Sequence, residues 1–132
     1  IITADHGHYD VTQPTQITTN SPIWNAMRST FGGDKRFAQL YLRNGYKQQV
    51  IDIIESQFAD KLTWVDPETA LKAGLFGNQP PHPEFFHRVG DLIIISRQDT
   101  CVYDQYNPRL PISMHGGLSD WEMIVPLLWR RI

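Results

Sequence analysis

The segment "RVGDLIIIS", residues 88–96, constrains the fold of this chain more than any other stretch. It contains a continuous run of large apolar side chains from Leu92 to Ile95, and most of these side chains are β-branched. Successive side chains of a strand point to opposite faces of a sheet, so a strand of this composition must be covered on both faces. The sequence therefore predicts a layered fold in which other elements pack on both sides of this strand.

Strand-like and helix-like segments alternate along the rest of the chain. The clearest helix is "YKQQVIDIIESQF", residues 46–58, in which apolar side chains recur one helical turn apart. Further strands are predicted at residues 1–4, 36–43 and 62–65, further helices at 22–30, 67–74 and after Ser119, and loops or irregular chain at 5–20, 77–87 and 98–114. This alternation predicts an α/β fold. We expect residues 35–96 to form a small α+β insertion, and residues 1–4 to be the end of a buried strand.

The composition excludes several classes of protein. Hydrophobic residues make up 41% of the 132 residues and charged residues 20%, as in ordinary folded domains. The net charge of −2 at pH 7 argues against a nucleic-acid-binding surface. No window approaches the roughly 18 apolar residues of a membrane-spanning helix. A single cysteine, Cys101, permits no internal disulfide and is compatible with a reducing compartment, so a cytoplasmic location is expected.

Two short motifs carry the residues best suited to chemistry. Asp5 and His6 follow the first predicted strand in "ITADHG", and His115 opens "HGGLS" before the last apolar segment. In open α/β sheets, ligands bind beyond the carboxyl ends of strands, and carboxylate plus imidazole suits Zn²⁺, Mn²⁺ or Fe. If both loops lie at the same edge, the three side chains form part of a metal site. The alternative from the residues alone is that all three are loop residues with satisfied hydrogen bonds.

The order of motifs resembles the C-terminal part of the alkaline phosphatase superfamily, and in particular its type I phosphodiesterase/nucleotide pyrophosphatase family. "ITADHG" is followed far downstream by "HGGLSDWEMIVPLL", and between them "RFAQLYLR", an amphipathic helix, "ALKAGLFG" and "HPEFFHRVGDLIII" follow the usual order of that family. The resemblance covers nearly the whole chain. It implies a partial alkaline-phosphatase-like layered sheet that carries the insertion.

The resemblance also implies the chemistry. In that family two divalent ions, usually zinc, clamp the attacking and leaving oxygens of a phosphoryl displacement. Asp5 and His6 match ligands of one ion and His115 matches a ligand of the other, with manganese as the alternative metal. The remaining ligands and the threonine nucleophile match positions upstream of Ile1. The resemblance thus implies hydrolysis of phosphodiester or nucleotide pyrophosphate bonds by the parent protein, with this chain alone inactive and no catalytic nucleophile within it.

Two alternatives remain open at this stage. A phosphomutase, phosphoglycerate mutase or sulfatase of the same superfamily would use another nucleophile upstream. A non-catalytic binding module formed by the insertion is the alternative of a different class. A partial sheet with exposed edges would also favour association with a second copy.

Other polar residues near the motifs have structural explanations. His8 matches no ligand of the family pattern, so we expect it to contact substrate or to lie exposed in a loop. Asp120 and Glu122 are expected in the first turn of the short helix, where negative charge is favourable. The pair Lys35-Arg36 is expected to be a solvated strand start.

Overall fold

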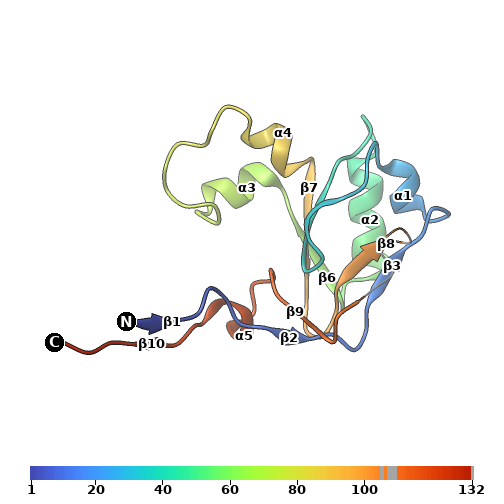
Figure 1. Ribbon diagram of the computed structural model, residues 1–132. Coiled ribbons are helices and arrows are strands. Elements are labelled where there is room, and N and C mark those ends of the chain that lie inside the picture. Colours follow the sequence, from blue (N-terminus) through green and yellow to red (C-terminus); the bar gives the residue numbers. More distant parts are fainter. Residues whose placement is uncertain (105, 107–109, 132) are drawn as a thin grey trace.

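A four-stranded antiparallel sheet lies at the centre of the computed structural model, which describes residues 1–104, 106 and 110–131 (Figure 1). Its strands in spatial order are β4 (Gly32–Asp34), β5 (Phe37–Leu40), β7 (Leu92–Ser96) and β6 (Leu62–Val65). The helices are α1 (Pro22–Ala26), α2 (Lys47–Gln57), α3 (Pro67–Lys72), α4 (Phe85–Val89) and α5 (Asp120–Met123). Three strand pairs complete the fold: β1 (Ile2–Thr3) with β10 (Leu127–Leu128), β2 (Tyr9–Asp10) with β9 (Ser113–Met114), and β3 (Thr15–Ile17) with β8 (Val102–Asp104).

Strand β7 is covered on both faces, which confirms the prediction from its composition. Leu92 and Ile94 join the larger core, to which α1 and α2 also contribute. Ile93, on the opposite face, packs with Ala70 of α3 and Val89 of α4. Figure 1 shows α1 and α2 on one side of β7 and α3 and α4 on the other. The α/β layering therefore follows from the alternation of side chains along a single strand.

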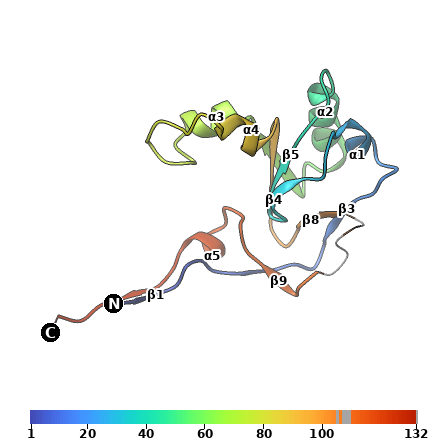
Figure 2. The same ribbon diagram turned by 45° about the horizontal axis from the view of Figure 1, so that its top comes forward.

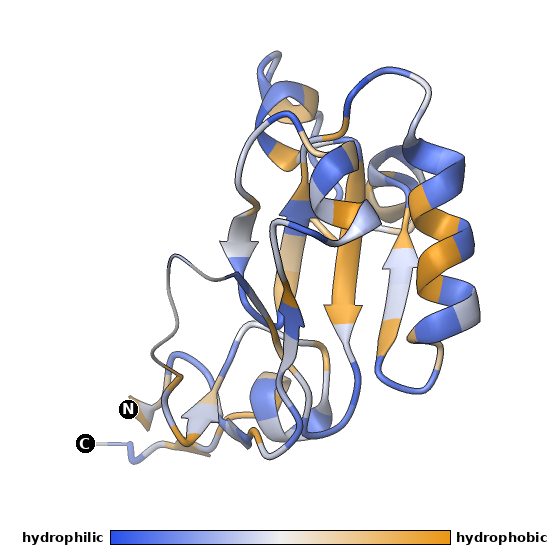
Figure 3. Cartoon of the chain, turned by 90° about the vertical axis from the view of Figure 1, so that its right-hand side faces the viewer, coloured by the Kyte–Doolittle hydropathy of each residue, from blue (hydrophilic) through white to orange (hydrophobic). Residues whose placement is uncertain are grey.

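Helix α2 matches the predicted amphipathic helix to within one residue at each end. Val50, Ile51 and Ile54 are buried against the larger core. Figure 3 shows that the ribbon of this helix carries both hydrophobic and hydrophilic residues. The N-cap of α3 also follows the sequence signal, since the Asp66 carboxylate accepts a hydrogen bond from the backbone N–H of Glu68 at 2.9 Å. Within the described residues, every helix is too short or too polar to cross a bilayer.

Two helical predictions differ from the structure. The helix predicted at 22–30 ends at Ala26, because the backbone N–H of Arg28 donates to the carbonyl of Tyr41 at 2.8 Å and the chain pairs with the segment after β5 instead. Helix α4 lies where a loop and the start of a strand were predicted. Its residues Phe85 and Val89 stand one turn apart and pack on the smaller core, so tertiary burial outweighs the proline-rich surroundings.

The chain enters and leaves the sheet through the strand pairs. Figure 2 shows β1 running alongside the red C-terminal segment, away from helices α1 to α4. The expectation that residues 1–4 end a buried strand is wrong for this chain: β1 exists, but Ile2 is 70% exposed because β1 pairs with β10 alone. Strands β8 and β9 lie in the segment predicted as irregular, of which residues 105 and 107–109 are outside the described chain.

Candidate metal centre

The two predicted ligand loops lie side by side. The antiparallel pairing of β2 with β9 sets Tyr9 opposite Met114, so the residues just before Tyr9 face those just after Met114. The pairing of β1 with β10 brings the same two segments together again on the far side of the loops (Figure 2). The fold thus joins two motifs that are more than a hundred residues apart in the chain.

Three imidazole rings meet at this junction. The rings of His6 and His115 are stacked, with centroids 3.7 Å apart and an interplanar angle of 20°. His8, for which we expected a substrate contact or an exposed loop position, lies 5.1 Å from the His6 ring and 5.4 Å from the His115 ring, centroid to centroid. The structure therefore brings His6 and His115 into direct contact and adds His8 to the cluster.

Asp5 and His6 place two possible metal-ligand atoms close to each other. The carbonyl oxygen of Gly7 lies 2.9 Å from Nδ1 of His6, and because a carbonyl can only accept, the Nδ1 nitrogen carries the proton. In the neutral form of this ring the lone pair is then on Nε2, which lies 3.5 Å from Oδ2 of Asp5. Two ligand atoms on one tetrahedral zinc ion are separated by about 3.3 Å, so this pair fits one ion.

The electrostatics of Asp5 suit a ligand. Hydrogen bonds from backbone N–H groups lower the pKa of its carboxyl group, chiefly that of Asp5 itself and then that of His6, whose N–H lies 3.1 Å from Oδ1. The side chain of Asp5 is 87% exposed and that of His6 is 32% exposed, so both are accessible. Among residues 1–104, 106 and 110–131, no three His, Cys, Asp or Glu side chains are arranged to enclose a metal ion.

A buried ion pair lies directly behind the loops. The Nε and Nη2 atoms of Arg36 donate to the two carboxylate oxygens of Glu122 at 2.6 and 2.9 Å. Arg36 is fully buried and Glu122 is 2% exposed. The expectation of a solvated strand start is therefore wrong for Arg36. Glu122 does occupy the first turn of α5, as expected together with Asp120, but its side chain points into the protein.

Glu122 stays ionised despite its burial. Desolvation acts to raise its pKa, but hydrogen bonds from Arg36, Ser119 and Gly117 outweigh this and hold the pKa of the carboxyl group below its ordinary value. The hydroxyl of Ser119 donates at 2.5 Å and the backbone N–H of Gly117 at 2.8 Å. The carboxylate is thus fully hydrogen-bonded, as a buried charge requires.

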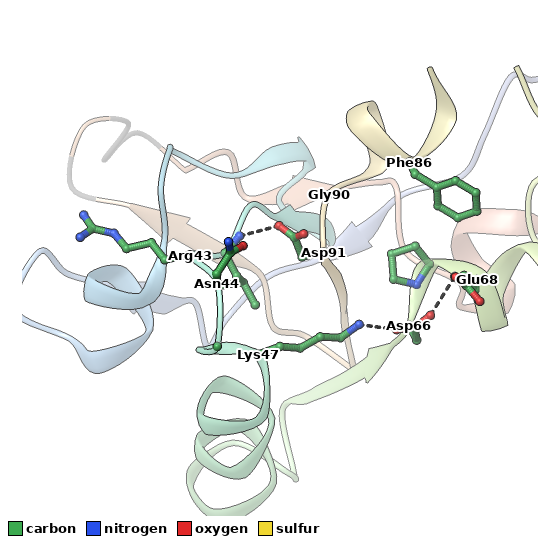
Figure 4. Close-up of a pocket in the computed structure, with 11 residues that line it drawn as sticks. Arg43, Asn44, Lys47, Asp66, Glu68, Phe86, Gly90 and Asp91 are labelled. Carbon is green, nitrogen blue, oxygen red and sulfur yellow. Dashed lines mark hydrogen bonds and ion pairs between the residues drawn. The ribbon is translucent and has the colours of Figure 1, made fainter. Parts of the chain in front are cut away.

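Two of the hollows on the surface differ in their relation to the histidine cluster. A shallow cavity of about 430 Å³ is lined by His8, His115, Asp34 and Ser113, among others. A hollow of about 530 Å³ lies between the starts of α2 and α3, far from the histidines in sequence (Figure 4). In that hollow Lys47 pairs with Asp66, so this cation and this carboxylate are already matched. His8 and His115 therefore line the cavity of about 430 Å³, whereas Asp5 and His6 are not among its lining residues.

Comparison with known proteins gives a fold but no close relative. No family model and no curated protein matches the sequence. Among solved structures, murine ectonucleotide pyrophosphatase/phosphodiesterase 5 superposes on 93% of this chain with a TM-score of 0.62 at 12% identity. The human protein of the same name superposes on 91% of this chain with a TM-score of 0.61 at 13% identity. Phosphonoacetate hydrolase from Sinorhizobium meliloti 1021, in complex with phosphonoformate, superposes on 94% of this chain with a TM-score of 0.61 at 20% identity.

These likenesses confirm the resemblance at the level of the fold. The chain has the α/β fold of the corresponding part of these two ectonucleotide pyrophosphatase/phosphodiesterases and of the phosphonoacetate hydrolase. It matches 30–34% of the length of each solved chain, so it spans about one third of those proteins.

Proposed function

We propose that this chain supplies part of a two-metal site in an enzyme that hydrolyses phosphodiester or nucleotide pyrophosphate bonds. The observation that carries the proposal is the contact between the rings of His6 and His115 at 3.7 Å, beside the carboxylate of Asp5. Support also comes from a fold shared with phosphodiesterases and a phosphonate hydrolase. The activity is proposed for the larger catalytic domain, since the chain covers about one third of those structures.

Each residue has a distinct part in the proposal. Asp5 and His6 would hold one ion through Oδ2 and Nε2, and His115 would hold the second. Two such ions, with zinc expected and manganese as the alternative, supply charge that stabilises the attacking and leaving oxygens of the phosphoryl group. The hydrogen bond between Nδ1 of His6 and the carbonyl of Gly7 fixes the tautomer in which Nε2 is free to bind.

Metal titration of the isolated chain tests the proposed ligands. Co²⁺ reports binding through its visible absorption, and Zn²⁺ can be titrated by calorimetry. We expect weak binding by the chain, reduced at least about tenfold by His6→Ala or by His115→Ala. His87→Ala is the matched control, because His87 is exposed and pairs only with Glu84 among the contacts described for it. Equal affinity of all four proteins would overturn the assignment.

The expected inactivity of the isolated chain has its own assay. Release of p-nitrophenol from bis(p-nitrophenyl) phosphate is measured with added Zn²⁺ or Mn²⁺. We expect no turnover above that of the free metal, because the described residues provide only part of a coordination shell. Robust turnover that His115→Ala abolishes would show that the chain is a complete enzyme.

Hydrolysis of phosphonates is a second candidate for the same site. Identity to phosphonoacetate hydrolase is 20%, against 12–13% for the two pyrophosphatase/phosphodiesterases. The candidates separate on substrate, since phosphate released from phosphonoacetate and nucleotide released from a dinucleotide are measured by different assays on the whole protein. The mutase and sulfatase alternatives differ from the proposed function in a nucleophile upstream of this chain. The binding-module alternative makes no use of the histidines.

Other aspects of the protein stay predictions. We propose residues 35–96 as the insertion, with the surrounding segments as the C-terminal fragment of the catalytic domain. A homo-oligomer and a cytoplasmic location are likewise predictions from the sequence. Sedimentation of the purified chain would test the first of these two, and localisation of the tagged whole protein would test the second.

A further inference from the structure

The buried ion pair of Arg36 and Glu122 contacts both ligand loops at once. We propose that these two are positioning residues, which hold the Asp5-His6 loop and the His115 loop face to face so that their ligands meet. This inference deepens the proposed metal-dependent function and rests on it for its purpose. The ion pair sets the distance between the two loops through its contacts with both of them.

Glu122 binds one loop with its backbone and the other with its side chain. Its carbonyl oxygen accepts a hydrogen bond from the backbone N–H of Gly7, the residue after His6, at 2.9 Å. Its Oε1 accepts a hydrogen bond from the backbone N–H of Gly117, two residues after His115, at 2.8 Å. Glu122 is therefore a direct link between the two segments that carry the ligands.

Arg36 anchors that link to the central sheet. Besides the two bonds to Glu122, its Nη1 donates to the carbonyl of Gln98 at 2.8 Å and to the carbonyl of Thr100. Its guanidinium carbon also lies 4.8 Å from the centre of the Tyr9 ring, on the strand that follows the first ligand loop. Four donor bonds and a ring contact leave Arg36 little freedom, so the loops are held relative to β5 and β2.

Two glycines make these short connections sterically feasible. A Cβ atom on Gly7 would lie 1.8 Å from the carbonyl oxygen of Trp121, and one on Gly117 would lie 2.7 Å from Oε2 of Glu122. Both values are shorter than real Cβ contacts. A larger residue at position 7 would push the backbone of α5 away, and one at position 117 would displace the Glu122 carboxylate from its hydrogen bonds. The glycine of "DHG" and the second glycine of "HGG" are thus explained by close packing on α5 and its glutamate.

Disturbing either charge should separate the ligands rather than unfold the sheet. Arg36 and Glu122 are paired inside the protein, so removal of the Glu122 charge leaves Arg36 as an uncompensated buried charge, which drives local opening to admit water. A lysine at position 36 keeps the positive charge but cannot reproduce the four donor bonds of the planar guanidinium, so it loosens the same link. The nearest parts that can open are the ligand loops and α5, because the cores around β7 are formed by other residues. The expected result is a longer distance between His6 and His115.

The test compares Arg36→Lys and Glu122→Gln with Arg28→Lys in the full chain. Arg28 is the matched control, since it also pairs with a carboxylate, that of Asp91, at 2.6 Å, and is not among the contacts of either ligand loop. One readout needs no metal: the nuclear Overhauser effect between the ring protons of His6 and His115. The second readout is Co²⁺ affinity.

We expect Arg36→Lys and Glu122→Gln to lose the ring-to-ring effect and to weaken Co²⁺ binding about 10- to 100-fold, with the amide spectrum of β5, β6 and β7 retained. Arg28→Lys should leave both readouts unchanged. Folded variants with the wild-type ring contact and affinity would overturn the inference. If the wild-type chain binds no Co²⁺ but the ring contact still depends on Arg36 and Glu122, the proposed metal site fails while the positioning role stands.

A milder variant covers the case in which Glu122→Gln does not fold. Ser119→Ala removes a single hydrogen bond to Oε2 of Glu122 and leaves the ion pair in place. We expect it to weaken Co²⁺ binding a few-fold and to reduce the ring-to-ring effect. Unchanged values for this folded variant would count against the positioning role.

Discussion

Replacing Gly7 with alanine gives the sharpest test of how α5 packs on the first ligand loop. The new Cβ would lie 1.8 Å from the carbonyl oxygen of Trp121, where real Cβ contacts are at least 3.0 Å. Helix α5 must therefore retreat by about 1.2 Å, the difference between these two distances. That shift stretches the 2.9 Å hydrogen bond from the N–H of Gly7 to the carbonyl of Glu122. Overpacking costs about 1–3 kcal/mol and a lost hydrogen bond about 0.5–1.5 kcal/mol, so we expect a total destabilisation of about 2–4 kcal/mol.

Urea unfolding followed by tryptophan fluorescence measures this loss. Gly45→Ala is the matched control: no atom lies within 4 Å of its Cβ position, and its backbone φ of +85° alone makes alanine unfavourable. We expect about 1–2 kcal/mol for that variant. We also expect the ring contact between His6 and His115 to weaken in Gly7→Ala and to persist in Gly45→Ala. A change in unfolding free energy below about 0.5 kcal/mol for Gly7→Ala would refute the packing argument, because hard overlap cannot be that cheap.

Three further predictions concern the core, an ionisable cap and the thiol. Ile54→Ala should lower the free energy of unfolding by about 2–5 kcal/mol in the same assay, because Ile54 is 1% exposed in the larger core; a loss under about 1 kcal/mol would contradict this. The pKa of the Asp66 carboxyl group is lowered, chiefly by the hydrogen bond from Lys47. Its contribution to the free energy of unfolding is therefore present above the ordinary pKa near 4, and it is lost as the pH falls through the lower pKa of the folded state. The difference in stability between wild type and Asp66→Ala, about 1 kcal/mol at pH 7, should shrink as the pH falls below about 4 in urea titrations; a constant difference would refute it. Burial raises the pKa of the Cys101 thiol and leaves it inaccessible, so Ellman's reagent should react with it only in denaturant, and rapid reaction of the native protein would disprove this.

Sequence patterns predicted those elements whose side chains repeat with the period of their secondary structure. The apolar run around Ile94 and the one-turn spacing of Val50 and Ile54 located β7 and α2, because both elements are buried by the faces that these residues define. Short elements without such repeats, such as α4, could not be predicted from local pattern. Their conformation is decided by contacts with residues far away in the chain.

The three proposed ligands could be suggested from the sequence, but the ion pair behind their loops was missed. Asp5, His6 and His115 were singled out by motif, while Arg36 was judged solvated because Lys35 precedes it. One signal was available: Arg36 is two residues before Ala38, which is 1% exposed, so strand alternation places both on the buried face. Its partner Glu122 is 86 positions away, and no local pattern reports a pairing over that separation.

The strand pairs at the base of the sheet have a consequence for the order in which the chain folds. Bringing Thr3 to Leu127 in an unfolded chain means closing a loop of more than a hundred residues. Once the sheet has formed, β3 and β8 already hold the two flanking segments together, and far less free chain remains to be closed. The entropic free-energy cost of closing the loop falls by roughly 1 kcal/mol as a result. The loops that carry the histidines should therefore be the last part of the chain to assemble, after the central sheet has folded.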